Sequence, residues 1–442
     1  MKITFMGAGS TIFVKSCIGD CLQTEAITKG GLDIALYDID GERLEESLLV
    51  VNSLNKRYNG GKANVKCYLG EGERREALRG ASFVINAIQV GGYEPCTVID
   101  FEIPKKYGLE QTIADTLGIG GIMRALRTIP VMRDFARDIE DVCPDAWLLN
   151  YTNPMCMLTN YMQRFTKVKT VGLCHSVQVC VPRLLDKLSL TEKYGNDYVA
   201  TIAGINHMAW LLTLTDKSGR DIYPEIREAA IRKNDTQKHE DMVRFEYIRR
   251  LGYYCTESSE HNAEYNPHFI KRNYPELIER YNIPLDEYPR RCVNQINGWK
   301  KQKEELFAGG EITHNRSREY CANIIEAMIT NKPYQIGGNV LNNGLITNLP
   351  REATVEVPCL VDASGIHPTY VGDLPTQLAA MNASNIYPQL LTVEAAVTGD
   401  RNKVYQAAMM DPHTAAELSI DDIIAMCDEL LAAHEAAGFK CI

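Results

Sequence analysis

The chain has 442 residues, of which 45% are hydrophobic and 24% are charged, and its formal net charge is −10. A chain of this length is too long for a domain with one ordinary hydrophobic core, so we expect two closely packed domains or one large α/β domain with an extension. No apolar run approaches the roughly 20 residues of a membrane span, and no Lys/Arg block offers the basic surface that nucleic acid requires. We therefore expect no membrane and no nucleic acid as partners, and chemistry on a small molecule.

The cysteines and the first residues indicate the compartment. Fourteen cysteines are scattered singly, without the spacing of a disulfide framework. The start "MKITFMGAGS" reaches glycine too soon for the apolar core of a secretory signal and is typical of a first strand. We expect reduced thiols and a cytoplasmic protein.

The first half of the chain alternates short strand-like runs with helical patterns. Between the second and third runs, four apolar residues recur on one face of a predicted helix: Leu44, Leu48, Val51 and Leu54. This alternation predicts an α/β fold with a doubly wound, Rossmann-type, mostly parallel sheet and ligands at the carboxyl ends of its strands. The predicted strands cover residues 2–6, 33–38, 64–69, 83–88, 146–150 and 170–174.

After about residue 195 the alternation weakens, which predicts a second, helix-rich α+β domain. The expected domains are 1–195 and 196–442. The last predicted helix starts at Ser419, with Asp422 three residues on, which is a common start signal. We expect it to pack on the body or on another subunit through a stripe formed by Ile420, Ile423, Ile424, Cys427, Leu430 and Leu431.

A glycine-rich turn, "GAGST", directly follows the first predicted strand. Bare glycines let a phosphate approach the backbone, and the following helix offers unpaired N–H groups. We expect Gly7, Gly9, Ser10 and Thr11 to bind a dinucleotide, although residue 12 is Ile where the fingerprint has Gly or Ala. The alternative is a tight turn in a domain that binds no nucleotide.

Asp38 ends the second predicted strand, where a carboxylate can accept hydrogen bonds from both ribose hydroxyls and would repel a 2′-phosphate. This favours NAD over NADP. Asp38 lies 29 residues after Gly9, which exceeds the usual spacing of about 20. Asp40 or a solvated turn is therefore the alternative.

Three stretches place polar groups just after apolar runs: Asn153 in "LLNYTNP", Cys174 and His175 in "VGLCHS", and His207 in "AGINHMAW". The first two follow strands of the same parallel sheet, which would bring them to one crevice. A Cys beside a His can be a nucleophile with its base, half of a metal site, or two core residues. A lone Cys after a strand is most often an inert buried thiol, and no short zinc motif is present.

Taken together, "GAGST", "ADTLGIGGIMRALRTIP", "LLNYTNP", "VGLCHS" and "AGINHMAW" resemble glycoside hydrolase family 4, the glycosidases that depend on NAD and a divalent metal. The stretches "TESSEHNAEYNPHFIKR", "LDEYPRRCV" and "AAMMDPHTAAELS" resemble its α-galactosidase (melibiase) branch, so the resemblance covers essentially the whole chain. It implies hydrolysis of a melibiose-type α-galactoside, with an α-glucoside or α-galacturonide as alternatives. A lactate/malate-type dehydrogenase would share the amino-terminal sheet but would have no use for a Cys–His metal pair.

The resemblance also assigns the domains and a mechanism. Residues 1–195 would bind NAD, and residues 196–442 would bind substrate and metal and form a homodimer or homotetramer. In the family, which is an exception among glycosidases, NAD takes a hydride from C3, a base removes the C2 proton, and the C1 group leaves. Water then adds to the unsaturated ketone, and NADH returns the hydride to C3. The implied metal is Mn²⁺ on Cys174 and His207, although the softness of a thiolate by itself favours zinc or iron.

The resemblance implies Tyr265 in "AEYNPHF" as the base. A phenol with a pKa near roughly 10 needs a neighbouring cation to act, which the metal, Arg290 or Arg291 would supply, and we expect Arg291 to contact the substrate. The alternative for Tyr265 is a hydrogen-bonded core residue. The acid is expected to be His175, which stands where several phosphoglycosidase members have Asp, or else Asp115 in "ADTLG".

By the same resemblance, Asn153 would bind sugar hydroxyls beside the metal. Phosphoglycosidase members also carry an Arg in the segment after the fourth strand. The corresponding stretch here, "GGYEPCTVID", has none, which favours a neutral galactoside over a phosphorylated sugar.

Overall fold

A single twisted sheet runs through the computed structural model, which describes residues 1–307 and 312–442. Along the sheet the strands follow the order β3-β2-β1-β4-β5-β6-β10-β11-β7-β8-β9, and β12 pairs with β11. The strands are β1 (Lys2–Met6), β2 (Asp33–Asp38), β3 (Asn64–Leu69), β4 (Phe83–Asn86), β5 (Trp147–Asn150), β6 (Lys169–Leu173), β7 (Tyr198–Ile205), β8 (Met208–Asp216), β9 (Tyr254–Cys255), β10 (Tyr334–Leu341), β11 (Thr354–Asp362) and β12 (Gly365–Pro368). The first six are parallel neighbours in the order 3-2-1-4-5-6, the arrangement of a doubly wound dinucleotide-binding fold. The predicted fold class is confirmed.

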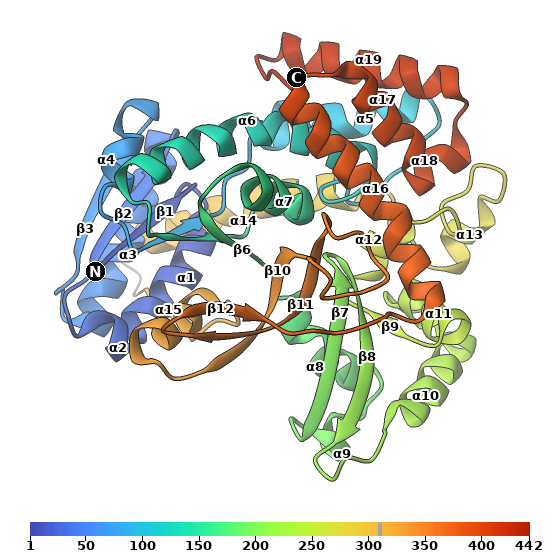
Figure 1. The fold of residues 1–442 in the computed structure, drawn as a ribbon, viewed down its shortest axis with the longest axis horizontal. Coiled ribbons are helices and arrows are strands. Elements are labelled where there is room, and N and C mark those ends of the chain that lie inside the picture. The colour runs from blue at the N-terminus through green and yellow to red at the C-terminus, as the bar shows by residue number, and fades with distance from the viewer. Residues whose placement is uncertain (308–311) are drawn as a thin grey trace.

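Helices cover both faces of this sheet (Figure 1). They are α1 (Thr11–Gln23), α2 (Glu25–Thr28), α3 (Gly41–Asn59), α4 (Arg74–Leu78), α5 (Val98–Lys106), α6 (Gly118–Val142), α7 (Met155–Phe165), α8 (Ser176–Lys187), α9 (Thr191–Tyr194), α10 (Tyr223–Thr236), α11 (Met242–Leu251), α12 (Ser259–Glu264), α13 (Glu276–Arg280), α14 (Glu287–Phe307), α15 (Cys321–Thr330), α16 (Thr376–Thr398), α17 (Arg401–Met410), α18 (Pro412–Glu417) and α19 (Ile420–Ala436).

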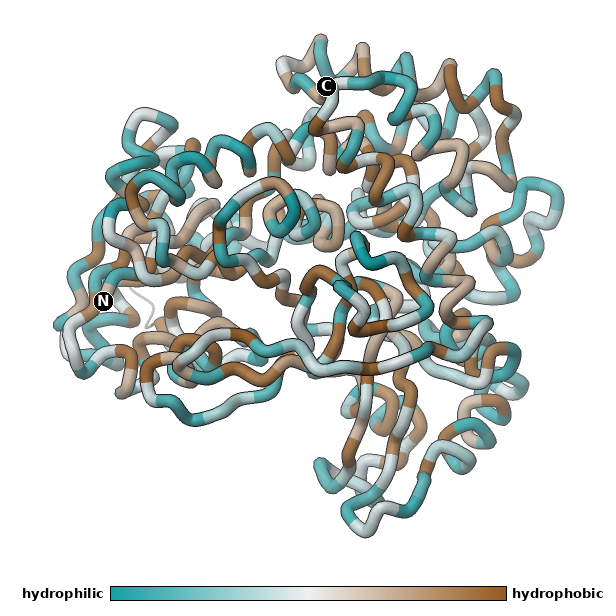
Figure 2. The backbone as a smooth tube through the Cα atoms, in the orientation of Figure 1, coloured by the Kyte–Doolittle hydropathy of each residue, from teal (hydrophilic) through white to brown (hydrophobic). Residues whose placement is uncertain are grey.

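Each face of the sheet has its own hydrophobic core. Helices α1, α3 and α15 pack together on one side, and α6, α7 and α16 pack together on the other. Helix α3 buries Leu44, Val51 and Leu54 and half-buries Leu48, as its sequence pattern predicts. Figure 2 shows the hydrophobic residues gathered along the central strands, where the helices cover them.

The second half of the chain extends the same sheet. Strand β10 runs antiparallel to β6, with Gly338 opposite Leu173 and Asn339 opposite Gly172. Strands β11, β7, β8 and β9 then follow, all antiparallel. Because the sheet is continuous across the expected boundary at residue 195, the division into 1–195 and 196–442 stays a prediction.

Helix α19 begins as its sequence signal predicts, since the Ser419 hydroxyl accepts the backbone N–H of Asp422 at 3.2 Å. The predicted apolar stripe is wrong at one end. Ile420 is 63% exposed although helical spacing places it on the same face, because as the first helical residue it stands at the end of the packed stripe. Met426 is buried in the stripe instead, beside Ile423, Cys427, Leu430 and Leu431.

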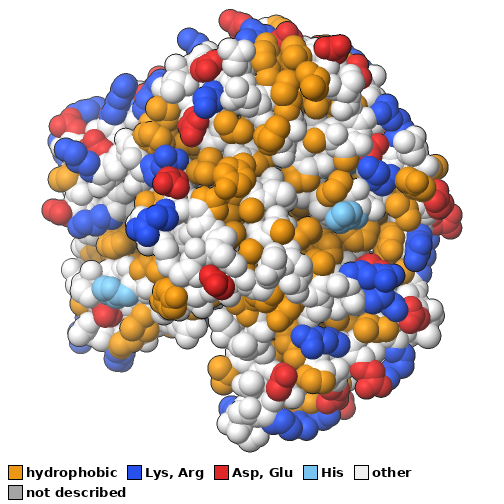
Figure 3. Space-filling view, turned by 45° about the vertical axis from the view of Figure 1, so that its right-hand side comes forward, with side chains coloured by type: hydrophobic (Ala, Val, Ile, Leu, Met, Phe, Trp, Pro, Cys, Tyr) orange, Lys and Arg blue, Asp and Glu red, His pale blue; other side chains and the backbone are white. Residues whose placement is uncertain are grey.

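All fourteen cysteines are free, as expected for reduced thiols. None of the helices in the described part of the chain is both long enough and apolar enough to cross a bilayer. Exposed apolar side chains occur on α16 and α17, among them Tyr387, Val397 and Met410. Figure 3 shows hydrophobic side chains in several surface areas, with charges of both signs between them. Such areas occur on monomers and on subunit interfaces alike, so the expected homodimer or homotetramer stays a prediction.

Candidate active site

The glycine turn after β1 lies against the end of β2, as the dinucleotide hypothesis requires. Gly7 has a φ of +86°, and a Cβ on it would stand 2.8 Å from the backbone C and O of Ala87. The Gly9 N–H donates to the Asp38 carboxylate at 2.5 Å. The structure therefore brings Gly7, Gly9 and Asp38 together at the carboxyl edge of the parallel strands.

The next residues start helix α1 without a side-chain cap. Ser10 occupies the N-cap position, but its hydroxyl makes no capping hydrogen bond. The first-turn N–H groups are thus free for an anion. Thr11 is buried, and its hydroxyl pairs with that of Ser47 at 2.9 Å. Asp40, the alternative to Asp38, caps α3 by accepting the Arg43 N–H.

Three further side chains from separate segments form a compact group of metal-ligand type: Cys174 after β6, His207 between β7 and β8, and Glu257 after β9. Their donor atoms all lie within 4.8 Å of one another. Glu257 Oε2 is 4.0 Å from Cys174 Sγ and 3.7 Å from His207 Nε2. One S, one N and one O donor at these separations suit a divalent cation that keeps further coordination positions open. Glu257 is a donor that the sequence prediction missed.

The charges in this group support a cation site. Burial disfavours a charged His207, yet Cys174 and Glu257 raise its pKa to about 10. Burial likewise opposes a charged Glu257, but His207 and His261 lower its pKa to about 2. A proton on His207 therefore balances the negative charge of Glu257, and a divalent cation would displace the proton on Nε2.

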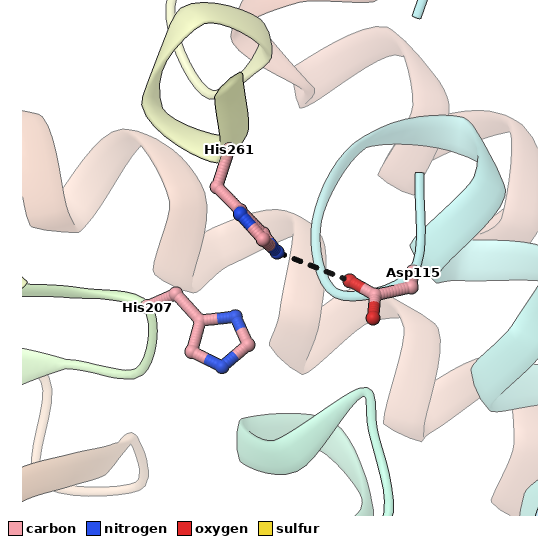
Figure 4. A group of neighbouring side chains, drawn as sticks. All are labelled: Asp115, His207 and His261. Atoms are coloured by element: carbon pink, nitrogen blue, oxygen red, sulfur yellow. Dashed lines mark ion pairs between the residues drawn. The ribbon is translucent and has the colours of Figure 1, made fainter. Parts of the chain in front are cut away.

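A second group shares His207 with the first and adds Asp115 and His261, as Figure 4 shows for these three side chains. The His261 ring directs Nε2 toward Asp115 Oδ1 at 3.9 Å, and the His207 and His261 ring centroids are 5.1 Å apart. The Asn153 amide donates to Asp115 Oδ2 at 3.3 Å. Burial opposes the negative charge of Asp115, but His261 and Arg124 lower its pKa below the usual range. This shift favours Asp115 as a hydrogen-bond acceptor, and its role as the alternative acid stays a prediction.

Tyr265 lies beside His261, with ring centroids 6.1 Å apart. Its side chain is 0% exposed, and within residues 1–307 and 312–442 its hydroxyl makes no hydrogen bond of good geometry, although the Thr116 side chain is near enough to act on its pKa. Burial, followed by Asp115, raises the pKa of this phenol well above 10. Buried polar groups nearly always have a partner, so this hydroxyl has the character of a group that awaits a ligand. Tyr265 as the base stays a prediction, with a hydrogen-bonded core tyrosine as the alternative.

Two other predicted site residues, His175 and Arg291, have their contacts outside the cluster formed by the side chains described above. The His175 side chain is 49% exposed, and its Nδ1 is 3.7 Å from Glu319. Burial lowers the pKa of His175. Arg291 donates to Glu287 at 2.8 Å and to Glu260 at 3.2 Å, so its contacts are with the flanking helices α12 and α14.

The cation that does reach the cluster is Arg124, which the sequence prediction missed. It is buried on α6, and its Nη1 is 3.9 Å from Asp115 Oδ2. Its guanidinium also lies over the Tyr288 ring at 5.2 Å. An arginine in the apolar run "GIGGIMRALRTIP" was the available signal, since an arginine is seldom buried without a partner.

Comparison with known proteins agrees with this architecture. The family model described as Family 4 glycosyl hydrolase matches residues 2–190, and that of the Family 4 glycosyl hydrolase C-terminal domain matches residues 202–414. The chain belongs to family 4 of the glycosyl hydrolases. Among its family 4 relatives, a protein named alpha-galactosidase from Bacillus subtilis (strain 168) is 61% identical over 98% of both chains. One of the same name from Rhizobium meliloti (strain 1021) is 34% identical over 98% of this chain and 88% of its own length.

Solved family 4 structures share the fold. A 6-phospho-beta glucosidase from Thermotoga maritima, solved with manganese, NAD+ and glucose-6-phosphate, matches with a TM-score of 0.78 and 20% identity over 99% of both chains. A 6-phospho-alpha-glucosidase from gut microorganisms, solved with NAD and Mn²⁺, matches with a TM-score of 0.79 and 19% identity over 98% of both chains.

Proposed function

We propose that this family 4 glycosyl hydrolase is an α-galactosidase that uses NAD and Mn²⁺. The observation that carries the proposal is the buried donor group of Cys174, His207 and Glu257 on a sheet whose first turn suits a dinucleotide. The relatives named alpha-galactosidase support the choice of substrate. The solved structures with NAD and manganese support the choice of cofactors.

The residues at the amino-terminal turn fit NAD. The close approach of Gly7 to Ala87 leaves no room for a side chain, and the uncapped start of α1 suits a pyrophosphate. Gly9, Ser10 and the backbone of Thr11 would hold this group, and Asp38 would accept the ribose hydroxyls. NAD supplies a reversible hydride acceptor, so a sugar carbon can be oxidised and restored within one turnover.

The residues at the donor group fit a divalent cation. Cys174, His207 and Glu257 would bind it, and positions for sugar oxygens and water would stay open. Mn²⁺ supplies Lewis-acid polarisation of the sugar oxygens. A carboxylate from Glu257 adds the hard oxygen donor that Mn²⁺ prefers, which offsets the softness of the Cys174 thiolate.

The remaining side chains would handle protons and hydroxyls. Tyr265, once a bound cation lowers its phenol pKa, would remove the proton at C2 of the sugar. The Asn153 amide and the ionised Asp115 suit sugar hydroxyls as donor and acceptor. His175, at the partly exposed start of α8, would protonate the leaving oxygen, and Arg291 would contact the part of the substrate nearest α12.

The test is hydrolysis of an aryl α-galactoside by the whole chain in the presence or absence of NAD, Mn²⁺ and a thiol reductant. We expect turnover only with all three, no accumulation of NADH, and deuterium at C2 of the product in heavy water. Matched aryl α-glucoside and α-galacturonide substrates test the two alternative specificities.

Full activity after removal of nucleotide and metal would refute the proposal. Stoichiometric release of NADH from a 2-hydroxy acid would instead indicate the dehydrogenase alternative. Hydrolysis without C2 exchange would exclude Tyr265 as the base at that carbon.

A further inference from the structure

The loop before α6 contacts the imidazole of His207 through one hydroxyl. Thr116 Oγ1 donates to Asp115 Oδ1 at 2.7 Å and lies 3.1 Å from His207 Nδ1. A hydroxyl has a single proton, and the Asp115 carboxylate can only accept it. Thr116 therefore presents a lone pair to His207, and the ring nitrogen that faces it must carry the proton.

This arrangement decides which nitrogen of His207 is free. With Nδ1–H donating to Thr116, the lone pair that remains after deprotonation is on Nε2, which stands 3.7 Å from Glu257 Oε2. Nε2 is thus the atom directed to the donor group that contains Cys174. Because Thr116 is buried, water does not compete for this hydrogen bond.

Glu264 fixes the loop that carries Thr116. The carboxylate of Glu264 on α12 accepts the backbone N–H groups of Thr112 at 2.7 Å, Ile113 at 3.2 Å and Ala114 at 2.8 Å. Ala114 adopts a left-handed backbone with φ +51°, which an L-residue holds only where its surroundings enforce it. Since α12 also carries His261, the loop and the cluster are tied to one rigid element.

We propose that Thr116 is a positioning residue that selects the metal-binding tautomer of His207, with Asp115 orienting its hydroxyl. The inference rests on the proposed function, in that a divalent cation binds at Nε2. Hydrogen bonds of this kind to a metal-ligating His change metal affinity by about 10- to 100-fold. Asp115 then acts on the cation through Thr116 and His207.

The chain offers a matched pair of variants. Thr116→Val keeps the shape and removes the hydroxyl that faces His207. Thr112→Val removes a buried hydroxyl of the same loop that donates to the Glu260 carbonyl at 2.7 Å, away from His207. Thr116→Ser retains the hydroxyl, and Thr116→Ala removes it with less demand on space if the valine variant does not fold.

The experiment is titration of each full-length variant with Mn²⁺, with free Mn²⁺ followed by electron paramagnetic resonance and folding followed by thermal unfolding. We expect Thr116→Val and Thr116→Ala to bind Mn²⁺ about 10- to 100-fold more weakly, and Thr116→Ser and Thr112→Val to stay within about 3-fold of the parent. Unchanged affinity in Thr116→Val, or an equal loss in Thr112→Val, would overturn the role of Thr116.

The Mn²⁺ titration contains no substrate, so it tests the role of Thr116 independently of galactoside hydrolysis. If the variants show the expected ranking of Mn²⁺ affinities but the parent chain hydrolyses no galactoside, only the proposed function is refuted. A parent chain that hydrolyses galactosides, while Thr116→Val binds Mn²⁺ like the parent, refutes the role of Thr116 alone.

Discussion

At the scale of single residues, the candidate chemistry depends on side chains that only the fold brings together. Cys174 ends the sixth parallel strand, His207 lies in a hairpin turn, and Glu257 follows a short strand, yet their donor atoms lie within 4.8 Å of one another. No spacing rule connects residues on three separate segments. The sequence therefore indicated Cys174 and His207 only through family resemblance.

We expect Cys174→Ser to lose Mn²⁺-dependent turnover and to bind Mn²⁺ at least about 10-fold more weakly, because a neutral hydroxyl replaces a thiolate donor. NAD binding should be largely retained, since the glycine turn and Asp38 do not contact this group. Mn²⁺ titration and fluorescence of bound dinucleotide measure the two effects. Cys180→Ser is the matched control, as Cys180 is also buried but lies six residues away on α8. Parallel loss of NAD and Mn²⁺ binding in Cys174→Ser would contradict the prediction.

Glu257 shows why part of the site was beyond sequence reasoning. Its segment, "TESSEHNAEY", holds three carboxylates, and nothing local tells which of them faces the metal group. The structure separates them by backbone direction. Glu257 has a φ of +66° and turns toward His207, Glu260 pairs with Arg291, and Glu264 accepts backbone N–H groups of another loop.

At the scale of secondary-structure elements, the parallel half of the sheet could be read from the sequence because each strand is a short apolar run bounded by turn residues. All six predicted parallel strands are present, three of them with the expected ends and three within two residues of them. The antiparallel addition of β10 to β6 could not be read, because no local pattern specifies which sheet edge a distant strand joins. Asn339 and Gly172, which pair there, are 167 residues apart.

The β1–turn–α1 element gives the sharpest test of the dinucleotide hypothesis. We expect Gly7→Ala to weaken NAD binding by at least about 10-fold and to lower the melting temperature, because its Cβ would meet the Ala87 backbone at 2.8 Å. Gly31→Ala is the control. It has nearly the same φ, +85°, but no atom within 4 Å of the new Cβ, so it shares only the backbone cost of about 1–2 kcal/mol. Dinucleotide titration and thermal unfolding measure the effects. Equal loss of NAD binding in both variants would show that close packing of the turn is not the cause.

At the scale of the whole molecule, buried carboxyl groups link stability to pH. Burial raises the pKa of Glu264, Glu319 and Glu356 from 4.5 to about 7 in each case. The folded chain therefore binds these protons more tightly than the unfolded chain does. Between about pH 4.5 and pH 7 the folded state holds more protons, so the free energy of unfolding falls as the pH rises and levels off above that range.

Replacing Glu264 by Gln isolates one share of this dependence. For a raised pKa of this size, linkage gives a loss of stability on the order of 3 kcal/mol between pH 4.5 and pH 8. We expect urea unfolding to show a smaller fall in stability from pH 5 to pH 8 in Glu264→Gln than in the parent, because the amide does not titrate.

Glu417→Gln is the control, since Glu417 also accepts a backbone N–H, from Arg272. Although burial opposes its charge, Lys271 and the Arg272 N–H lower the pKa of Glu417, so this carboxyl does not share the raised pKa of Glu264. A fall in Glu264→Gln as large as that of the parent would show that the Glu264 carboxyl is already ionised at pH 5. The three backbone N–H bonds that Glu264 accepts would then outweigh its burial, because hydrogen bonds to a carboxylate favour the charged form.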